Sequence, residues 1–162
     1  MQMQHFPSWA LSSETYLLTA LLHDIGTTDK NITATLMSFE FYGGYLSLDI
    51  LRSHHAPIEQ AEAVAEAVIR HQDIGESGKI TTLGQLIQLA TIFDNTGKHA
   101  ELLHEKTIED VIEGYHRKGW SQCFADTIRR ENGLKPWAHT TALGEEEFPG
   151  MVLANKVGGK WD

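Results

Sequence analysis

The sequence predicts an all-α fold that forms a single domain over residues 1–162. Apolar residues recur at helical spacing in one segment after another, and short polar stretches separate these segments. No segment alternates apolar and polar residues for more than a few positions, so β-strands are not expected. The 162 residues, 41% hydrophobic and 22% charged, have the size and composition of one globular domain with a buried core.

Helix start and stop signals mark the first three predicted helices. Residues 12–14 supply small cap residues and a first-turn carboxylate, and Gly26 provides a stop. The polar stretch 27–33 then predicts a loop. The pair Gly43–Gly44 in the second helix favours a bend or a close approach of two backbones, and Pro57 suits the first turn of the third helix.

The second half of the chain predicts four further helices. Thr81 and Thr82 can cap a strongly apolar segment that ends at Asn95, and Gly119 separates the next two helices. The stretch 135–148 is polar and is expected to be irregular. In chain order, the predicted helices span residues 12–25, 37–52, 57–71, 81–95, 107–118, 120–131 and 145–156.

Charge and apolar runs restrict the classes of partner. Thirteen Lys and Arg residues against 22 Asp and Glu give a net charge of −9, which disfavours binding to nucleic acid or to an anionic membrane surface. No apolar run approaches the ~20 residues of a membrane span, and the N-terminus shows no signal peptide. Cys123 has no partner for a disulfide, so we expect it to be buried and the protein to be cytoplasmic.

The nine histidines prompt a search for a metal site, because histidine is the commonest metal ligand. His23 and Asp24 lie together at the end of a very apolar helix, where an ionised carboxylate needs a partner. Asp94 is a second acid inside an apolar segment. An imidazole and two carboxylates on such helices indicate a divalent metal, namely zinc, iron or manganese. The alternative is that Asp24 caps a neighbouring turn and that His23 is a hydrogen-bonded core histidine.

The stretch LLHDIGTTDKN around this pair resembles the central motif of the HD-domain metal-dependent hydrolases, and more narrowly that of the fungal cyanamide hydratases. The similarity continues through MSFEFYGG, AEAVIRHQD, ITTLGQLIQLATIFDN and KPWAHTTALG, and extends from about Phe6 to Asn155. The resemblance implies a single HD-domain helical bundle, with His23 and Asp24 as paired metal ligands and Asp94 as the distal carboxylate ligand. It further implies Zn²⁺ as the cofactor, ahead of Fe²⁺ or Mn²⁺, and hydration of cyanamide to urea as the reaction.

The resemblance also implies one ligand that this sequence does not supply. HD-domain enzymes take a further histidine from a helix upstream of the HD pair, at a distance that would precede Met1 here. His5 stands beside FPSW, which in the family follows that helix, so we do not expect His5 to be this ligand. The expectation is therefore an N-terminally short HD domain, either because the protein is longer or because this form is truncated.

The substrate's chemistry assigns roles to further residues. A metal-activated hydroxide would attack the nitrile carbon, and a donor would protonate the nitrile nitrogen. His71, at a helix end, is the first candidate for moving protons or polarising the substrate, while Lys30 and Asn31 could orient water or substrate. His139, with Trp137, could close the pocket. The alternative for His71 is an exposed helix-end histidine. For Lys30 and Asn31 it is a solvated loop, and for His139 and Trp137 it is a tail packed on the core.

Two other functional readings stay open. An HD-type phosphohydrolase acting on a nucleotide would need cations around the phosphates, and Lys30, Arg52 and Arg70 are the ones near the motifs. A truncated, weakly active or inactive HD-domain protein is the second. The expected partner is a small neutral nitrile, with no nucleic acid and no membrane, and pairing into a homodimer is left open.

Overall fold

The computed structural model describes residues 1, 5–74, 78–159 and 162, and all regular structure within them is helical. This confirms the predicted all-α class. The α-helices are α2 (Ser13–Leu22), α3 (Asp29–Thr33), α4 (Phe39–Ser53), α5 (Ile58–Arg70), α6 (Thr82–Thr96), α7 (Glu105–Gly114), α8 (Trp120–Leu134) and α9 (Glu147–Leu153). Short 3-10 turns occur at η1 (Pro7–Trp9), η2 (Ile25–Thr27), η3 (Ala100–Leu102) and η4 (His139–Leu143).

Two segments differ from the sequence prediction. The polar stretch 27–33, expected as a loop, contains α3, because Asp29 provides a first-turn carboxylate and Ile32 buries its side chain almost completely. The stretch 135–148, expected to be irregular, contains η4, whereas α9 begins inside the predicted helix 145–156. Cys123 is exposed, so its predicted burial is wrong: it lies on the outer side of α8, whose core face is formed by Phe124, Ala125 and Ile128.

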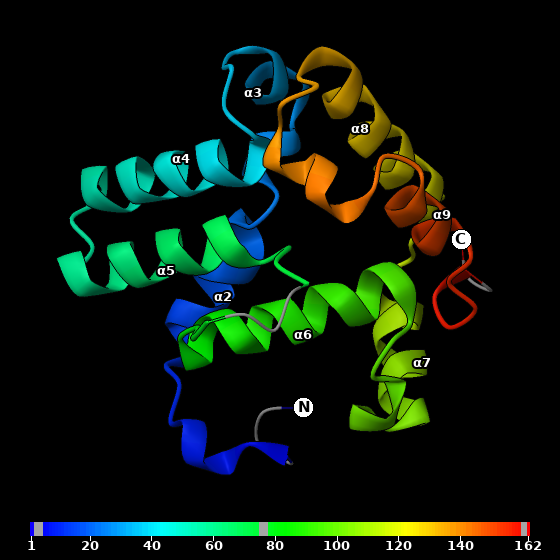
Figure 1. Cartoon of the computed structure of the whole chain (residues 1–162). Helices are drawn as coiled ribbons and strands as arrows, with labels where there is room; N and C mark the ends of the chain where they lie inside the picture. Colours follow the sequence, from blue (N-terminus) through cyan, green and yellow to red (C-terminus); the bar gives the residue numbers. More distant parts are fainter. Residues whose placement is uncertain (2–4, 75–77, 160–161) are drawn as a thin grey trace.

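The helices pack in two groups that meet at the N-terminus of α4 and where α6 contacts α9. Helix α5 lies between α4 on one side and α2 and α6 on the other, while α8 and α9 pack together beside them (Figure 1). Three apolar clusters form the core. Their buried members are Leu51, Ala61, Val64 and Val68 in the first, Ala67, Leu83 and Ile87 in the second, and Phe39, Phe124, Ile128, Phe148 and Val152 in the third.

Close backbone approach explains two glycines. A Cβ on Gly44 would lie 2.9 Å from Ile69 Cδ1 and 3.0 Å from the carbonyl oxygen of Ala65, which confirms the close approach predicted for this helix. Gly26 lies in η2 against the first residue of α4, where a Cβ would overlap the Phe39 carbonyl oxygen and lie 2.8 Å from the carbonyl carbon. The turn after His23 and Asp24 therefore rests directly on the backbone of α4.

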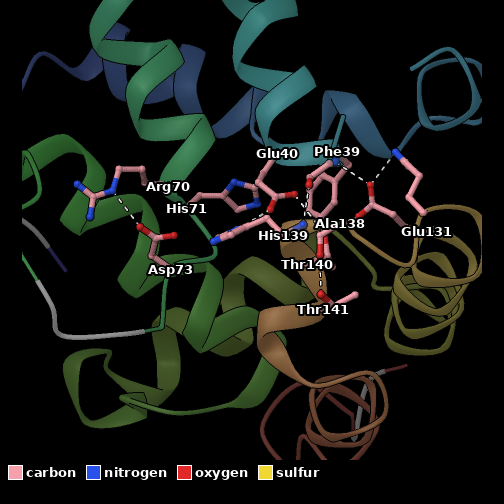
Figure 2. Close-up of polar contacts among 12 residues, drawn as sticks. Phe39, Glu40, Arg70, His71, Asp73, Glu131, Ala138, His139, Thr140 and Thr141 are labelled. Carbon is pink, nitrogen blue, oxygen red and sulfur yellow. Dashed lines mark hydrogen bonds and ion pairs between the residues drawn. The ribbon is translucent and has the colours of Figure 1, made fainter. Parts of the chain in front are cut away.

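A buried carboxylate ties the start of α4 to the second group of helices. Glu131 Oε1 accepts hydrogen bonds from the Phe39 backbone N–H at 2.7 Å and from Lys135 Nζ at 2.8 Å (Figure 2). Glu131 Oε2 accepts from the Thr140 hydroxyl at 2.5 Å. Lys135 Nζ also donates to the Met37 carbonyl oxygen at 2.7 Å. Each buried charge is thus paired, as burial of ionised groups requires.

Among the residues that the structure describes, none of the helices combines the length and the apolar character needed to cross a bilayer.

Replacement of Gly26 by alanine should destabilise the fold by about 1–3 kcal/mol or more, the range for overpacking a tight site. The added Cβ would collide with backbone atoms of Phe39, which cannot move aside as a flexible side chain can. Gly150→Ala is the matched control, because the position is exposed within α9 and a Cβ there meets nothing within 4 Å. Chemical denaturation should show it unchanged or up to ~1 kcal/mol more stable. Equal, small effects for both variants would contradict the close approach.

Candidate functional site

The predicted pair His23–Asp24 lies where α2 gives way to η2. His23 caps the C-terminus of α2, and its Nδ1 donates to the Ala20 carbonyl oxygen at 2.8 Å, since a carbonyl can only accept. Its Nε2 lies 3.2 Å from Asp24 Oδ2. The Asp24 backbone carbonyl accepts the Thr27 hydroxyl at 2.8 Å, which fixes the turn. The local fold thus aims the outer nitrogen of His23 at the Asp24 carboxylate.

His71 lies on the other side of the same carboxylate. It caps the C-terminus of α5 with only 1% of its side chain exposed, so the alternative of an exposed helix-end histidine is wrong. Its Nδ1 donates to the Val68 carbonyl oxygen at 2.6 Å, and its Nε2 lies 3.5 Å from Asp24 Oδ1. The rings of His71 and His23 meet edge-on with centroids 5.1 Å apart. Both imidazoles therefore present Nε2 to Asp24.

Two of these atoms are buried without a hydrogen-bond partner. They are Asp24 Oδ1 and His71 Nε2, which face each other. Buried polar atoms in native proteins are almost always satisfied, so such a pair indicates a bound group. Imidazoles whose Nδ1–H is held by a carbonyl are typical metal ligands through Nε2. The donor set therefore suits a divalent metal, although no group of three or more His, Cys, Asp or Glu in the described ranges is already arranged around one ion position.

The pair's electrostatics favour the charged forms of both residues. Burial opposes ionisation of Asp24, but the neighbouring imidazoles of His23 and then His71 outweigh it and hold the Asp24 pKa far below its usual value. Burial likewise opposes the charged form of His23, but the bond and charge of Asp24 raise the His23 pKa. Both shifts favour an ion pair in which His23 Nε2 donates to the Asp24 carboxylate.

Asp94, the predicted distal ligand, lies on α6 and pairs with Arg117. Its Oδ1 accepts from Arg117 Nη1 at 2.5 Å, and its side chain is about half exposed. Arg117 also contacts Asp162 Oδ1 at 3.2 Å and lies over the Trp120 ring. Asp94 is still close enough for its charge to add to the raised pKa of His23. The structure thus brings His71, rather than Asp94, into contact with the His23–Asp24 pair.

A largely apolar cavity of about 160 Å³ adjoins Asp94. Asp94 and Arg117 form one wall, and the inner side of α7 forms another through Ile108, Val111 and Ile112. The lining residues do not include His23, Asp24 or His71. The cavity therefore touches Asp94 but none of the three residues of the cluster.

Residues 29–31, which follow the His23–Asp24 pair, make contacts that stabilise the neighbouring turn. Asn31 Nδ2 donates to the Ile25 carbonyl oxygen at 2.9 Å, so Asn31 braces η2. Lys30 is exposed. Asp29 pairs with Arg130 at 2.5 Å, which fastens α3 to α8. Direct roles of Lys30 and Asn31 in orienting water or substrate remain predictions.

A second polar cluster involves a residue that sequence reasoning missed. Glu40, only 1% exposed, accepts a hydrogen bond from His139 Nδ1 at 2.9 Å (Figure 2). The sequence signal was a lone acid among aromatic residues in SFEFY, but its partner lies 99 residues away. Trp137, named beside His139 as a pocket residue, instead donates through Nε1 to the Leu36 carbonyl oxygen at 3.0 Å.

The His23–Asp24 pair should stabilise the metal-free protein most between about pH 4 and pH 6.5. The lowered pKa of Asp24 gives a contribution that is present above its unfolded-state value and lost on acidification. The raised pKa of His23 gives a contribution that is present below its unfolded-state value and lost as the pH rises through its folded value. The free energies of unfolding of the wild type and of Asp24→Asn, measured by denaturation, should differ by about 1–3 kcal/mol in this window and by less on either side. A difference that does not change with pH would contradict the pairing.

Comparison with known proteins places the chain in a family. No family model matches it. Two curated proteins of Saccharomyces cerevisiae, cyanamide hydratase DDI2 and cyanamide hydratase DDI3, are each 46% identical to it over 154 residues. The match covers 94% of this chain and 68% of each relative. At this identity and coverage, the chain belongs to the cyanamide hydratase family.

Proposed function

We propose that this protein catalyses the hydration of cyanamide to urea. The observation that carries the proposal is the 46% identity, over 94% of the chain, to two proteins named cyanamide hydratase. The cluster of His23, Asp24 and His71 supports it, because the buried, unpaired Asp24 Oδ1 and His71 Nε2 suit a metal ion that would activate water.

The reaction asks little of the protein beyond water activation and proton transfer. Cyanamide is small and neutral, with an electrophilic nitrile carbon. Water adds across the C≡N bond: the carbon–oxygen bond forms, one C–N π bond breaks, and the nitrile nitrogen takes up a proton. The resulting isourea tautomerises to urea. The site must therefore take a proton from water and deliver one to nitrogen.

We propose zinc as the metal and the HD-domain superfamily as the wider relationship. His23 Nε2, an Asp24 carboxylate oxygen and His71 Nε2 would hold the ion, in place of the proton that His23 shares with Asp24. When bound, zinc would supply a Lewis acid that lowers the pKa of a coordinated water towards neutrality. Asp94 would join these ligands on release from Arg117.

This assignment changes the role proposed for His71. Its Nδ1 is committed to Val68 and its Nε2 is buried against Asp24. An Nε2 that binds a metal cannot also carry a proton, so His71 acts as a ligand in this proposal and the proton transfer falls to another group.

One of the three cations considered for phosphate binding in nucleotide phosphohydrolysis is already engaged by other groups. Arg70, one of the cations considered for phosphate binding, is held by Asp73 at 2.9 Å and by the Lys79 carbonyl oxygen at 2.8 Å. Arg117, beside Asp94, is likewise engaged by carboxylates.

Purified protein loaded with zinc should release urea from cyanamide. Asp24→Asn and His71→Gln should each lower kcat/KM by more than ~100-fold, since even outer partners of metal ligands are worth 10–100-fold. His116→Gln, at an exposed position outside the cluster, is the matched control and should leave the rate unchanged. Absence of urea from the zinc-loaded wild type would refute the proposal.

Zinc titration of the metal-free protein tests the ligand set separately from activity. Asp94→Asn should weaken zinc binding about tenfold or more if Asp94 joins the shell, and His71→Gln should weaken it at least as much. Arg117→Met should tighten binding, because it frees the Asp94 carboxylate. Identical zinc affinity for wild type, Asp94→Asn and Arg117→Met would exclude Asp94 as a ligand.

A further inference from the structure

We propose that Glu40 and His139 form a carboxylate–imidazole pair that moves protons during hydration. His139 Nε2 would take a proton from the attacking water and return one to the nitrile nitrogen, and Glu40 would position the ring and stabilise its charged form. The inference rests on the proposed function, because it concerns the proton transfer that cyanamide hydration requires.

The His139 ring is fixed with one nitrogen committed. Nδ1 donates to Glu40 Oε1 at 2.9 Å, and the His139 backbone N–H donates to Ser38 Oγ at 2.7 Å. The ring stacks on Phe41 with centroids 5.1 Å apart. Because 44% of the side chain is exposed while Glu40 is buried, the ring links a buried carboxylate to the solvent-accessible side. This arrangement leaves Nε2 to exchange protons.

Glu40 relies on His139 as a hydrogen-bond donor, because the Thr140 hydroxyl lies closer to another carboxylate. The Thr140 hydroxyl lies 2.5 Å from Glu131 Oε2 and 3.2 Å from Glu40 Oε2, but its single proton can serve only one carboxylate. Glu131 is closer and already has Lys135 as its counterion at 2.8 Å. Among the residues that the structure describes, the ion-pair partner of Glu40 is His139. A buried carboxylate in this position stabilises the positive charge that forms when the imidazole accepts a proton.

One turn of α4 contacts both this pair and His71 of the candidate metal site. Phe39 packs edge-on against the His71 ring, with centroids 5.8 Å apart, and the next two residues, Glu40 and Phe41, contact His139. Figure 2 shows His71 and His139 both reaching this turn from different elements. The two histidines therefore share one support.

The partners of Nδ1 distinguish the two imidazoles chemically. His71 Nδ1 faces the Val68 carbonyl, which orients the ring but carries no net charge. His139 Nδ1 faces a carboxylate, which orients the ring and also stabilises an imidazolium. By this criterion His71 suits a ligand and His139 suits a proton carrier.

The kinetic test compares wild type, His139→Ala and His139→Ala with added imidazole, all loaded with zinc and assayed for urea. General acid–base catalysis contributes about 10²–10⁴-fold, so kcat of His139→Ala should fall by that factor with a smaller change in KM. Added imidazole should restore at least tenfold of the lost kcat, which a merely structural contact would not allow. A kcat within threefold of wild type, or a loss that imidazole leaves unchanged, overturns the proposal.

Two further variants distinguish a loss of catalysis from a loss of the folded structure. His139→Asn keeps a donor toward Glu40 in the place of Nδ1 but has no Nε2, and Glu40→Gln keeps the shape of the acid without its charge. Both should retain the wild-type melting temperature within a few degrees and lose kcat at least tenfold. His139→Asn replaces His139→Ala should the latter unfold, and wild-type kcat in the folded Asn variant overturns the proposal.

A measurement without turnover separates this inference from the proposed function. Long-range ¹H–¹⁵N NMR spectra of the metal-free wild type should show neutral His139 with its proton on Nδ1 and a free Nε2. A proton on Nε2 instead would overturn the pair. Absence of urea from the wild type would refute the proposed function, whereas the tautomer would still decide whether the pair exists.

Discussion

The Asp24 carboxylate is contacted by two imidazoles that have no freedom to turn away from it. His23 and His71 come from the ends of two different helices, and each uses Nδ1 to donate to a carbonyl of its own helix's last turn. Nε2 of both rings is consequently held 3.2 and 3.5 Å from Asp24. The arrangement leaves two buried atoms unsatisfied, a cost that proteins rarely accept without a ligand.

The N-terminus of α4 is the support on which this arrangement rests. Gly26 lets the turn after Asp24 lie against Phe39, whose ring in turn packs against His71. Glu131, on α8, accepts a hydrogen bond from the Phe39 N–H and so links the first turn of α4 to α8. Changes in this turn should therefore affect both histidines together, since His139 is bound to the adjacent Glu40.

Much of the fold followed from local patterns, and the failures have local causes. Helices with an apolar stripe and clear caps, such as α5 and α6, agree with prediction within one or two residues. The short helix α3 was missed because its polar composition hides a single buried anchor, Ile32. Periodicity cannot reveal an anchor of one residue.

Several residues of the candidate site could be proposed from the sequence, but their contacts could not, and Glu40 was missed. His23, Asp24 and His71 could be named from the sequence, yet the burial of His71 depends on helices packed around it. The pairing of Asp94 with Arg117 joins residues 23 positions apart, and that of Glu40 with His139 joins residues 99 positions apart. Such pairs are set by tertiary packing, for which spacing along the chain carries no signal.

The position of zinc in crystals of the loaded protein tests the central claim most directly. Anomalous scattering at the zinc edge should show one strong peak within about 2.0–2.2 Å of His23 Nε2, an Asp24 oxygen and His71 Nε2. A zinc peak held elsewhere, for instance by the exposed His54–His55 pair, with none beside Asp24, would contradict the account.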